Sequence, residues 1–554
     1  MLATVLSRAA FGMKAPPVTI DVHVGPGLPA LTVVGLAEAA VRESKDRVRS
    51  ALTTTGFQWP PGRVTVNLSP ADLPKDGGRF DLPIALAILA ATCQLESRFL
   101  MPYEFYGELS LGGELRPVRG MLASLCQAAL EHHRVLLPRG NATEAERVES
   151  ARVVAAANLA EVIHHLTGER PLPEVPRASA EVNDVAYPDL AEVRGQPQAR
   201  RALEIAAAGA HSLLLIGPPG AGKSMLAHRL PGILPPLSSA EALESALIAS
   251  ASAQGFRAEH WSSRPFRSPH HTSTTAALVG GGSPPAPGEI SLAHHGVLFL
   301  DELPEFERET LEALREPLET ARITISRAAW QSEFPARFQL VAAMNPCPCG
   351  YAGEGTAYAG KASGYAAEGS GYAGKASGYA GEGSCRCRCS RVSIERYRAR
   401  LSGPLLDRLD LHVRVGRTDV TTLFNARNLS DSSAVVRLRV ARARTRQLER
   451  QGALNSALTS SDLERYAHPD RESCDLLSFT AHRFNLSARA YGRILRVART
   501  IADLAAADAM TVHHVSEALL FRALDDDGLD TQPRAVPYAQ PSEERDERPG
   551  SGFH

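Results

Sequence analysis

The chain has little of several features that would reveal a protein's class at once. Its 554 residues include 8 cysteines and 6% aromatic residues, and its formal net charge is -1. So few cysteines argue against a disulfide scaffold at this length, and the balanced charge removes any global attraction to nucleic acid. A DNA or RNA partner would have to meet a local basic surface.

Long apolar segments are missing as well. The longest mostly apolar run, Leu82–Leu95, has 14 residues, which is too short to span a bilayer and typical of a buried helix. The N-terminal sequence lacks the charged, apolar and cleavable regions of a secretory signal. We therefore expect a cytoplasmic protein with no membrane partner.

What is present suffices for several folded domains. Hydrophobic residues make up 44% of the chain, which excludes a disordered or collagen-like protein. Only six of the 60 basic residues are lysines. Arg is frequent throughout the chain, so its presence at one site is weak evidence of phosphate binding. A Lys within a motif is more informative because Lys is rare here. At roughly 100–200 residues per domain, the length predicts about three domains.

Patterning divides the chain into five parts. Strand-like and helix-like runs are mixed over residues 1–168 and predict an α+β domain, and the polar, Pro-containing segment 169–188 has the composition of a linker. Over residues 189–418, buried strands alternate with helices, which predicts a parallel sheet of α/β type. Residues 419–525 have helical spacing, and the polar tail 526–554 is predicted to be disordered.

One segment of the α/β part differs from the rest. Residues 351–384 form a tandem repeat of a seven-residue unit that begins with Tyr. The units start at Tyr351, Tyr358, Tyr365, Tyr372 and Tyr379. Gly, Ala and Ser cannot build a core, and a Gly in every unit excludes a coiled coil. A flexible insertion is expected.

A phosphate-binding motif follows the strand-like run Ser212–Ile216. It matches GxxxxGK[ST] and consists of Gly217, Pro218, Pro219, Gly220, Ala221, Gly222, Lys223 and Ser224. In such a loop the backbone N–H groups surround phosphate oxygens. Lys223 would reach the β and γ phosphates, and Ser224 would ligate magnesium.

Further polar positions match nucleotide hydrolysis. The apolar run Val297–Leu300 ends in Asp301 and Glu302, which would hold magnesium and polarise the attacking water, respectively. Asn345, at the end of the next strand-like run, could hold that water, and Arg408 could serve as an arginine finger. Without the other motifs, Asn345 would be interpreted as a turn residue and Arg408 as a surface helix residue.

Several segments together resemble the ComM/YifB type of magnesium-chelatase-like AAA+ ATPases. They read GPPGAGKS, FRSPHHT, GEISLAHHGVLFLDELPEF, MNPCPCG, RYRARLSGPLLDRLDLHV and LSARAYGRILRVARTIADL. The resemblance implies an AAA+ P-loop core with a C-terminal helical lid, and a ring of identical subunits, usually a hexamer, with ATP at the junctions. It also implies that Asn345 is sensor 1, that Arg408 acts on the neighbouring subunit's ATP, and that Arg489 is sensor 2.

The N-terminal α+β domain resembles the Lon protease domain, which has the ribosomal S5 domain 2-like fold. The similarity lies in Leu73–Gly77 and Tyr106–Val118. The position of the Lon nucleophile holds Arg79, and that of its Lys falls at or near Leu122. We therefore expect a non-proteolytic, structural or docking domain.

The clustered cysteines are candidate zinc ligands. They form a CxC and a CxCxC motif and are Cys347, Cys349, Cys385, Cys387 and Cys389. Four thiolates suit tetrahedral zinc, and related proteins carry two such pairs around a short loop. Here 35 residues separate Cys349 from Cys385, an expansion that loop closure tolerates. Which of the last three cysteines would bind zinc stays open, and free thiols are the alternative.

Contacts with DNA are less defined by the sequence. Segments 263–282 and 322–335 resemble two insertions that reach the ring pore in this clade. Candidates for holding a strand are Arg264, Arg267, Arg322 and Arg327. The arginines of the helical run 437–450 are better explained as a solvated face, because the whole chain is rich in Arg.

The resemblance implies a ring-forming, ATP-driven DNA motor. It would be a helicase or branch-migration factor that uses ATP and magnesium to promote DNA integration in recombination and natural transformation. Single-stranded or branched DNA is the expected partner, and a recombinase is a candidate partner. A magnesium-chelatase subunit is disfavoured by the Lon-like domain and the cysteines. A protein-remodelling ATPase remains the third hypothesis, and polypeptide-stimulated hydrolysis would favour it.

Overall fold

The structure is a computed structural model, and it describes most of the chain. The described residues are 1–35, 39–75, 77–177, 187–282, 285–327, 330–352, 387–418, 430–484 and 486–522. Nearly all of the predicted repeat, residues 178–186 of the predicted linker, the start of the predicted helical part and the whole predicted tail lie outside these residues. Cys385 lies outside them too.

The N-terminal domain is built on a seven-stranded mixed sheet with the order β3-β4-β2-β1-β5-β8-β9. Strand β1 is antiparallel to β2 and parallel to β5. The apolar runs Val18–Val24, Leu31–Val34, Val64–Leu68 and Val135–Leu137 predict strands and lie in β2, β3, β4 and β8, whereas β1, β5 and β9 were not predicted. The strands are β1 (Leu2–Arg8), β2 (Pro17–Gly25), β3 (Ala30–Val34), β4 (Arg63–Ser69), β5 (Tyr103–Phe105), β8 (Arg134–Pro138) and β9 (Arg152–Ala156).

Helices α1 (Ala39–Thr54), α2 (Asp81–Ala91), α3 (Met121–Leu130), α4 (Ala142–Ala145) and α5 (Leu159–Thr167) complete this domain. Every residue of α2 is buried, which confirms the prediction of a buried helix there. Its first residue, Asp81, is ionisable and fully buried, and Arg47 binds it at 2.7 Å. The paired guanidinium offsets the cost of burying that carboxyl group.

The predicted parallel sheet is confirmed in the second domain, with the strand order β11-β14-β17-β10-β18. Alternate residues of its strands enter two different cores, since successive strand side chains point to opposite faces. Val297 and Phe299 join one cluster, and Leu298 and Leu300 the other. The strands are β10 (Leu213–Ile216), β11 (Phe266–Arg267), β14 (Val297–Leu300), β17 (Gln339–Met344) and β18 (Leu411–Arg414).

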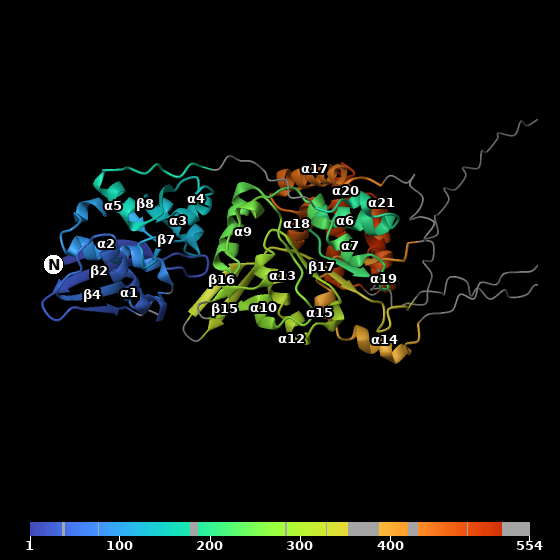
Figure 1. The fold of residues 1–554 in the computed structure, drawn as a ribbon. Coiled ribbons are helices and arrows are strands. Elements are labelled where there is room, and N and C mark those ends of the chain that lie inside the picture. Colours follow the sequence, from blue (N-terminus) through green and yellow to red (C-terminus); the bar gives the residue numbers. More distant parts are fainter. Residues whose placement is uncertain are drawn as a thin grey trace, which may run out of the picture.

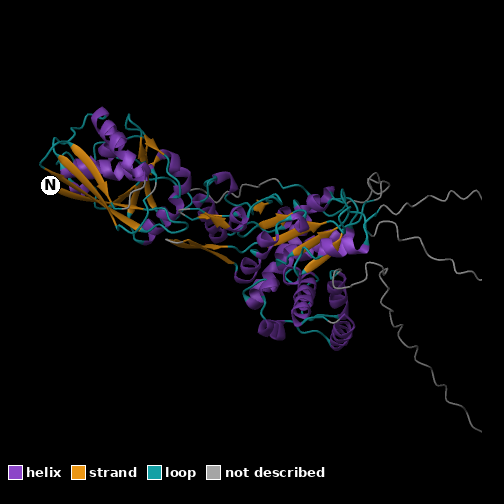
Figure 2. Cartoon of the chain, turned by 90° about the horizontal axis from the view of Figure 1, so that it is seen from below, coloured by secondary structure: helices purple, strands orange, loops and turns teal. Residues whose placement is uncertain are grey.

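A helical region follows and packs on α6 (Pro197–Gly209) (Figure 1), and Figure 2 distinguishes the helices of the chain from its strands by colour. His211, after α6, joins the two parts: its Nε2 lies 2.8 Å from Thr500 Oγ1, and its Nδ1 lies 3.3 Å from Asp410 Oδ2. The helices are α17 (Ser433–Gln451), α18 (Ser460–Tyr466), α19 (Arg471–Phe484), α20 (Ala488–Leu504) and α21 (Val512–Leu520). No helix among the described residues is long and apolar enough to cross a membrane.

The arginines of α17 correct the expectation of a solvated face. Arg439 binds Glu204 and Asp431, and Arg450 binds Asp503 at 2.6 Å. Arg437 and Arg444 donate to the carbonyl oxygens of Gly232 and Ala207, each at 2.9 Å. The helical spacing of these arginines did not show that α17 packs against other helices, including α6 and α20. Only Arg442 and Arg446 of this run are exposed.

The N-terminal domain contacts the second domain through α9 (Ser239–Ala251), which lies beside α3 in Figure 1. Ala246 of α9 joins an apolar cluster with Met121 and Leu125, and Ser250 Oγ donates to Glu144 at 3.1 Å. Burial raises the pKa of that carboxyl group. A second contact is made by the hairpin of β15 (Arg322–Arg327) and β16 (Trp330–Pro335), which extends toward this domain.

Candidate nucleotide and metal sites

The phosphate loop connects β10 to α7 (Lys223–Ala227). Gly220 and Gly222 have φ angles of 77° and 88°, in the left-handed region that residues with a Cβ rarely adopt. A Cβ on Gly217 would lie 2.1 Å from the carbonyl oxygen of Val415 on the neighbouring chain segment. Glycine is therefore required for the backbone shape that the sequence motif predicted.

Lys223 lies inside this loop. Its Nζ donates to the carbonyl oxygens of Gly217 at 2.7 Å and Pro218 at 3.0 Å, and to Asn345 Oδ1 at 3.1 Å. Burial lowers the pKa of Lys223, and the nearby carboxylates of Asp301 and Glu302 act in the opposite direction. Lys223 thus lies where three sequence motifs meet: the phosphate loop, the carboxylate pair and Asn345 at the end of β17.

The carboxylate pair comes from the end of β14, which lies one strand away from β10, across β17. Ser224 Oγ donates to Asp301 Oδ2 at 2.6 Å, so both predicted magnesium ligands lie side by side. Serine hydroxyl and carboxylate oxygens are ligands that magnesium accepts in nucleotide sites. Glu302 follows with a φ of 53°, and its carboxylate is 53% exposed and 3.4 Å from His271 Nδ1.

The two predicted arginines lie elsewhere. Arg408, just after α15 (Gly403–Leu406), donates to the Pro404 carbonyl at 2.6 Å and to the carboxylate of Glu319 on α13 (Arg315–Thr320). Arg489, on α20, lies 3.8 Å from the same carboxylate. Glu319, which sequence reasoning missed, therefore groups the two arginines, and neither of these contacts involves the phosphate loop.

Four cysteines come together beside the nucleotide site. The Sγ atoms of Cys347, Cys349, Cys387 and Cys389 all lie within 4.8 Å of one another. Three of these distances are 3.4, 3.7 and 3.8 Å. A tetrahedral zinc ion with four thiolates at about 2.3 Å requires separations of about 3.8 Å between sulfur atoms. The four described cysteines fit a zinc ion, and Cys385 lies outside the described residues.

The cysteine cluster is joined to the ATP-binding elements. Cys347 follows Asn345 by two residues, and Gly350 lies so close to Pro219 of the phosphate loop that a Cβ would be 2.5 Å from its Cδ. Tyr351 continues the segment, with the Arg417 guanidinium 5.3 Å from its ring centre. An ion bound to the cysteines would hold this turn, and with it the position of Asn345.

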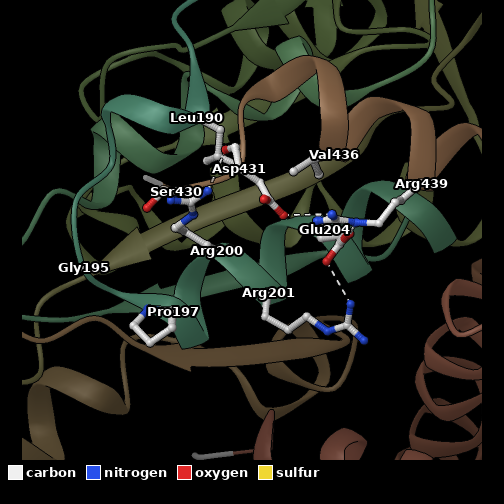
Figure 3. Close-up of a pocket in the computed structure, with 10 residues that line it drawn as sticks. All are labelled: Leu190, Gly195, Pro197, Arg200, Arg201, Glu204, Ser430, Asp431, Val436 and Arg439. Atoms are coloured by element: carbon white, nitrogen blue, oxygen red, sulfur yellow. Dashed lines mark hydrogen bonds and ion pairs between the residues drawn. The ribbon is translucent and has the colours of Figure 1, made fainter. Parts of the chain in front are cut away.

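A cavity of about 420 Å³ lies between α6 and α17, with charged side chains along its wall (Figure 3). Arg201 and Arg439 both bind Glu204, and Arg439 also binds Asp431 at 2.8 Å. Arg200, the third arginine of the wall, donates to the backbone carbonyl oxygens of Val193 at 3.2 Å and Asp431 at 2.8 Å. The cavity therefore marks the junction between the sheet domain and the helical region.

The predicted DNA-holding arginines are partly corrected. Arg264 is buried and donates to the carbonyl oxygens of Pro235 at 2.6 Å and His295 at 2.7 Å. Arg267 binds the carboxylate of Glu289 at 2.5 and 2.7 Å. Both side chains thus stabilise the domain itself. The side chain of Arg322 is 68% exposed and pairs with Glu333. The side chain of Arg327 is not among those that the structure describes.

The two positions that the resemblance to Lon assigned to catalysis, Arg79 and Leu122, lie in the interior of the N-terminal domain. Arg79 is buried, and its guanidinium donates to the carbonyl oxygens of Arg8 and Arg119. Arg119 lies three residues before Leu122, whose backbone N–H donates to Glu144 at 3.2 Å. An arginine and a leucine cannot form a nucleophile–base pair.

The parallel sheet, phosphate loop and carboxylate pair define a P-loop nucleotide-binding fold. Family models match three parts of the chain. The model described as "Magnesium chelatase, subunit ChlI" matches residues 189–378 and 372–423. The model described as "Magnesium chelatase, subunit ChlI C-terminal" matches residues 430–522. "Subunit ChlI of Mg-chelatase" matches residues 20–141, so the N-terminal domain cannot be used to separate this chain from the chelatases.

Complete relatives are similar over nearly the whole chain. YifB of Escherichia coli is 45% identical over 524 residues, which cover 95% of this chain and 97% of that protein. Competence protein ComM of Haemophilus influenzae is 45% identical over 527 residues, 94% of this chain and 98% of ComM. A Mycobacterium tuberculosis protein is 40% identical over 528 residues. The chain belongs to the ComM/YifB type of magnesium-chelatase-like AAA+ proteins, a family that suggests ATPase activity.

Proposed function

We propose that the chain is the subunit of a ring-forming AAA+ ATPase that moves DNA. Support comes first from the separation of the two halves of the predicted catalytic set. Lys223, Ser224 and Asp301 are joined at the phosphate loop, whereas Arg408 and Arg489 meet at Glu319. This separation carries the proposal, because an arginine outside its own ATP site can complete the site of a neighbouring subunit.

The proposed chemistry is ATP hydrolysis. The phosphate loop and Lys223 would hold the β and γ phosphates, and Ser224 and Asp301 would hold magnesium, which neutralises charge on the phosphate oxygens. Glu302 would polarise the attacking water and Asn345 would orient it. Arg408 and Arg489 of the next subunit would stabilise the charge that develops on the transferred phosphoryl group. The helical region would act as the lid that places Arg489.

The proposed polymer is single-stranded or branched DNA, and the proposed activity is helicase or branch migration in DNA integration. A relative that is similar over 98% of its own length is named competence protein ComM, and this name supports a role with incoming DNA. The exposed Arg322 of the hairpin is the candidate contact in the ring pore. We further propose that the N-terminal domain is non-proteolytic and that the cysteine cluster binds zinc.

Polymer-dependent ATP hydrolysis by the purified chain tests this proposal. Turnover would be measured with no polymer, single-stranded DNA, branched DNA and unfolded polypeptide, with Lys223→Ala as the blank. Stimulation by DNA supports the motor. Stimulation by polypeptide alone would support protein remodelling instead, and the absence of stimulation by either polymer would favour a chelatase-type subunit.

A further inference from the structure

A buried histidine joins the helical region to the segment that carries Arg408. His211, between α6 and β10, is fully buried. Its Nε2 lies 2.8 Å from Thr500 Oγ1 on α20, and its Nδ1 lies 3.3 Å from Asp410 Oδ2. Asp410 follows Arg408 by two residues. One side chain therefore contacts both the helical region and the segment of the proposed arginine finger.

The position of His211 and the groups that it contacts are fixed by further hydrogen bonds. Its carbonyl oxygen accepts from Gln339 Nε2, at the start of β17, at 2.8 Å. The Thr500 hydroxyl donates to the Arg496 carbonyl at 2.9 Å, so its oxygen is left to accept from His211. Burial acts to raise the pKa of Asp410, but the hydrogen bond with His211 holds that pKa below its ordinary value. Both partners of His211 are therefore acceptors held in place.

The Arg408 segment is attached to the edge of the sheet opposite to the phosphate loop. Ser212, the residue after His211, donates from its Oγ to the Arg408 carbonyl at 2.8 Å, just before β10 begins. The phosphate loop starts at Gly217, after the other end of β10. A strand rises about 3.3 Å per residue, so Ser212 and Gly217 are about 16 Å apart. The backbone of Arg408 is therefore far from the phosphate loop of its own chain.

Helix α20 presents one row of side chains to the same segment. Residues spaced by four and seven positions share a helix face, and this row consists of Arg489, Arg493 and Thr500. Arg489 lies 3.8 Å from the Glu319 carboxylate, which also binds Arg408. The Arg493 guanidinium donates to the Leu409 carbonyl at 3.5 Å. Together with the link through His211, α20 therefore has three connections to residues 408–410.

We propose that His211 is a positioning residue that fixes the Arg408 segment to α20, so that Arg408 and Arg489 reach the ATP of the neighbouring subunit as one unit. This inference rests on the proposed function, because it takes both arginines to act on that ATP. A misplacement of about 1 Å can cost about 10²-fold in rate. Loss of the link should therefore lower kcat. The KM for ATP should stay unchanged, because the phosphate loop that holds ATP belongs to the other subunit.

Thr500→Val tests the link in rings mixed from two inactive subunits. Valine matches threonine in shape but lacks the hydroxyl that accepts from His211. A Glu302→Gln subunit supplies only the arginines, and an Arg408→Ala subunit supplies only the ATP site. With Thr500→Val added to the Glu302→Gln subunit, ATP turnover of the mixture should fall several-fold at unchanged KM. With Thr500→Val added to the Arg408→Ala subunit, turnover should equal that of the parent mixture.

A second threonine provides the matched control. Thr480, on α19, is also buried, and its hydroxyl donates to the Leu476 carbonyl at 2.7 Å, the same bond to the residue four positions earlier that Thr500 makes. Thr480→Val in the Glu302→Gln subunit should leave the turnover of the mixture unchanged. His211→Phe, which keeps a ring but loses both polar contacts, should lower it as Thr500→Val does.

The outcomes separate this inference from the proposed function. An equal fall in both arrangements, or no fall with Thr500→Val in the subunit that supplies the arginines, overturns the positioning role. If the parent mixture recovers no activity, the action of the arginines on a neighbouring subunit is wrong instead. Thr500→Val in the otherwise unchanged chain then decides the inference. A lower kcat at unchanged KM still supports the positioning of Arg408, and an unchanged kcat overturns it.

Discussion

Mixing two inactive variants tests whether Arg408 completes the ATP site of a neighbouring subunit. Glu302→Gln removes the water-activating carboxylate and keeps Arg408, whereas Arg408→Ala keeps the carboxylate and removes the finger. In the single chain, Arg408 is held by Glu319 and the Pro404 carbonyl. Loss of an arginine finger costs about 10³–10⁵ in kcat, so each pure variant should be nearly inactive.

The mixture has a predictable activity. In a closed ring each junction joins the ATP site of one subunit to the arginine of the next, whatever the ring size. In an equimolar random mixture, about one quarter of junctions combine an intact Glu302 with an intact Arg408. Turnover of the mixture should therefore rise to about one quarter of wild type for junctions that act independently.

The assay is ATP hydrolysis after the two variants are dissociated, mixed and reassembled. If Arg408 acted within its own subunit, every subunit of the mixture would lack one catalytic group, and turnover would stay at the level of the pure variants. Arg489→Ala, mixed with Glu302→Gln in the same way, should also recover activity, because Arg489 shares Glu319 with Arg408. No recovery in either mixture refutes the placement of the arginines.

Two further predictions concern metal and pH. Elemental analysis should find zinc in the wild type and none in Cys387→Ser. That variant should also have lower ATP turnover, because the cluster adjoins Asn345, whereas the exposed control Cys93→Ser should change neither. Burial lowers the pKa of His412 to about 3 from its ordinary 6.5. As the pH falls below 6.5, His412 therefore becomes protonated in the unfolded state and stays neutral in the folded state. At pH 5 this costs about 2 kcal/mol of stability, which His412→Phe should recover in denaturant unfolding compared with pH 7.5. Equal acid sensitivity of both proteins would contradict the reasoning.

The ATP-binding half of the site could be predicted from the sequence because its parts are local. Gly217–Ser224 follows an apolar strand directly, and Asp301 and Glu302 end another. In a parallel sheet the carboxyl ends of strands meet at one edge, so adjacency in the fold follows from each motif alone. The structure brings Lys223, Ser224, Asp301 and Asn345 together as these local patterns indicated.

The rest depended on contacts between distant segments. Nothing near Glu319 in the sequence marks it as the partner of Arg408, which is 89 residues away. Arg264 is a residue type that commonly contacts DNA, yet its guanidinium donates to backbone carbonyl oxygens of two other segments. Spacing alone did not show that Cys387 and Cys389 lie beside Cys347 and Cys349. His211 precedes a buried strand, but its contacts with Asp410 and Thr500 required the fold.

In the proposed function, ATP hydrolysis moves DNA. The most direct measurement is the movement of a branch point in a labelled branched DNA, followed over time with wild type and with Glu302→Gln in the presence of ATP. Wild type should move the branch point, and the variant, although it binds ATP and assembles, should leave it in place. Equal movement by both proteins, or none by an actively hydrolysing wild type, would contradict it.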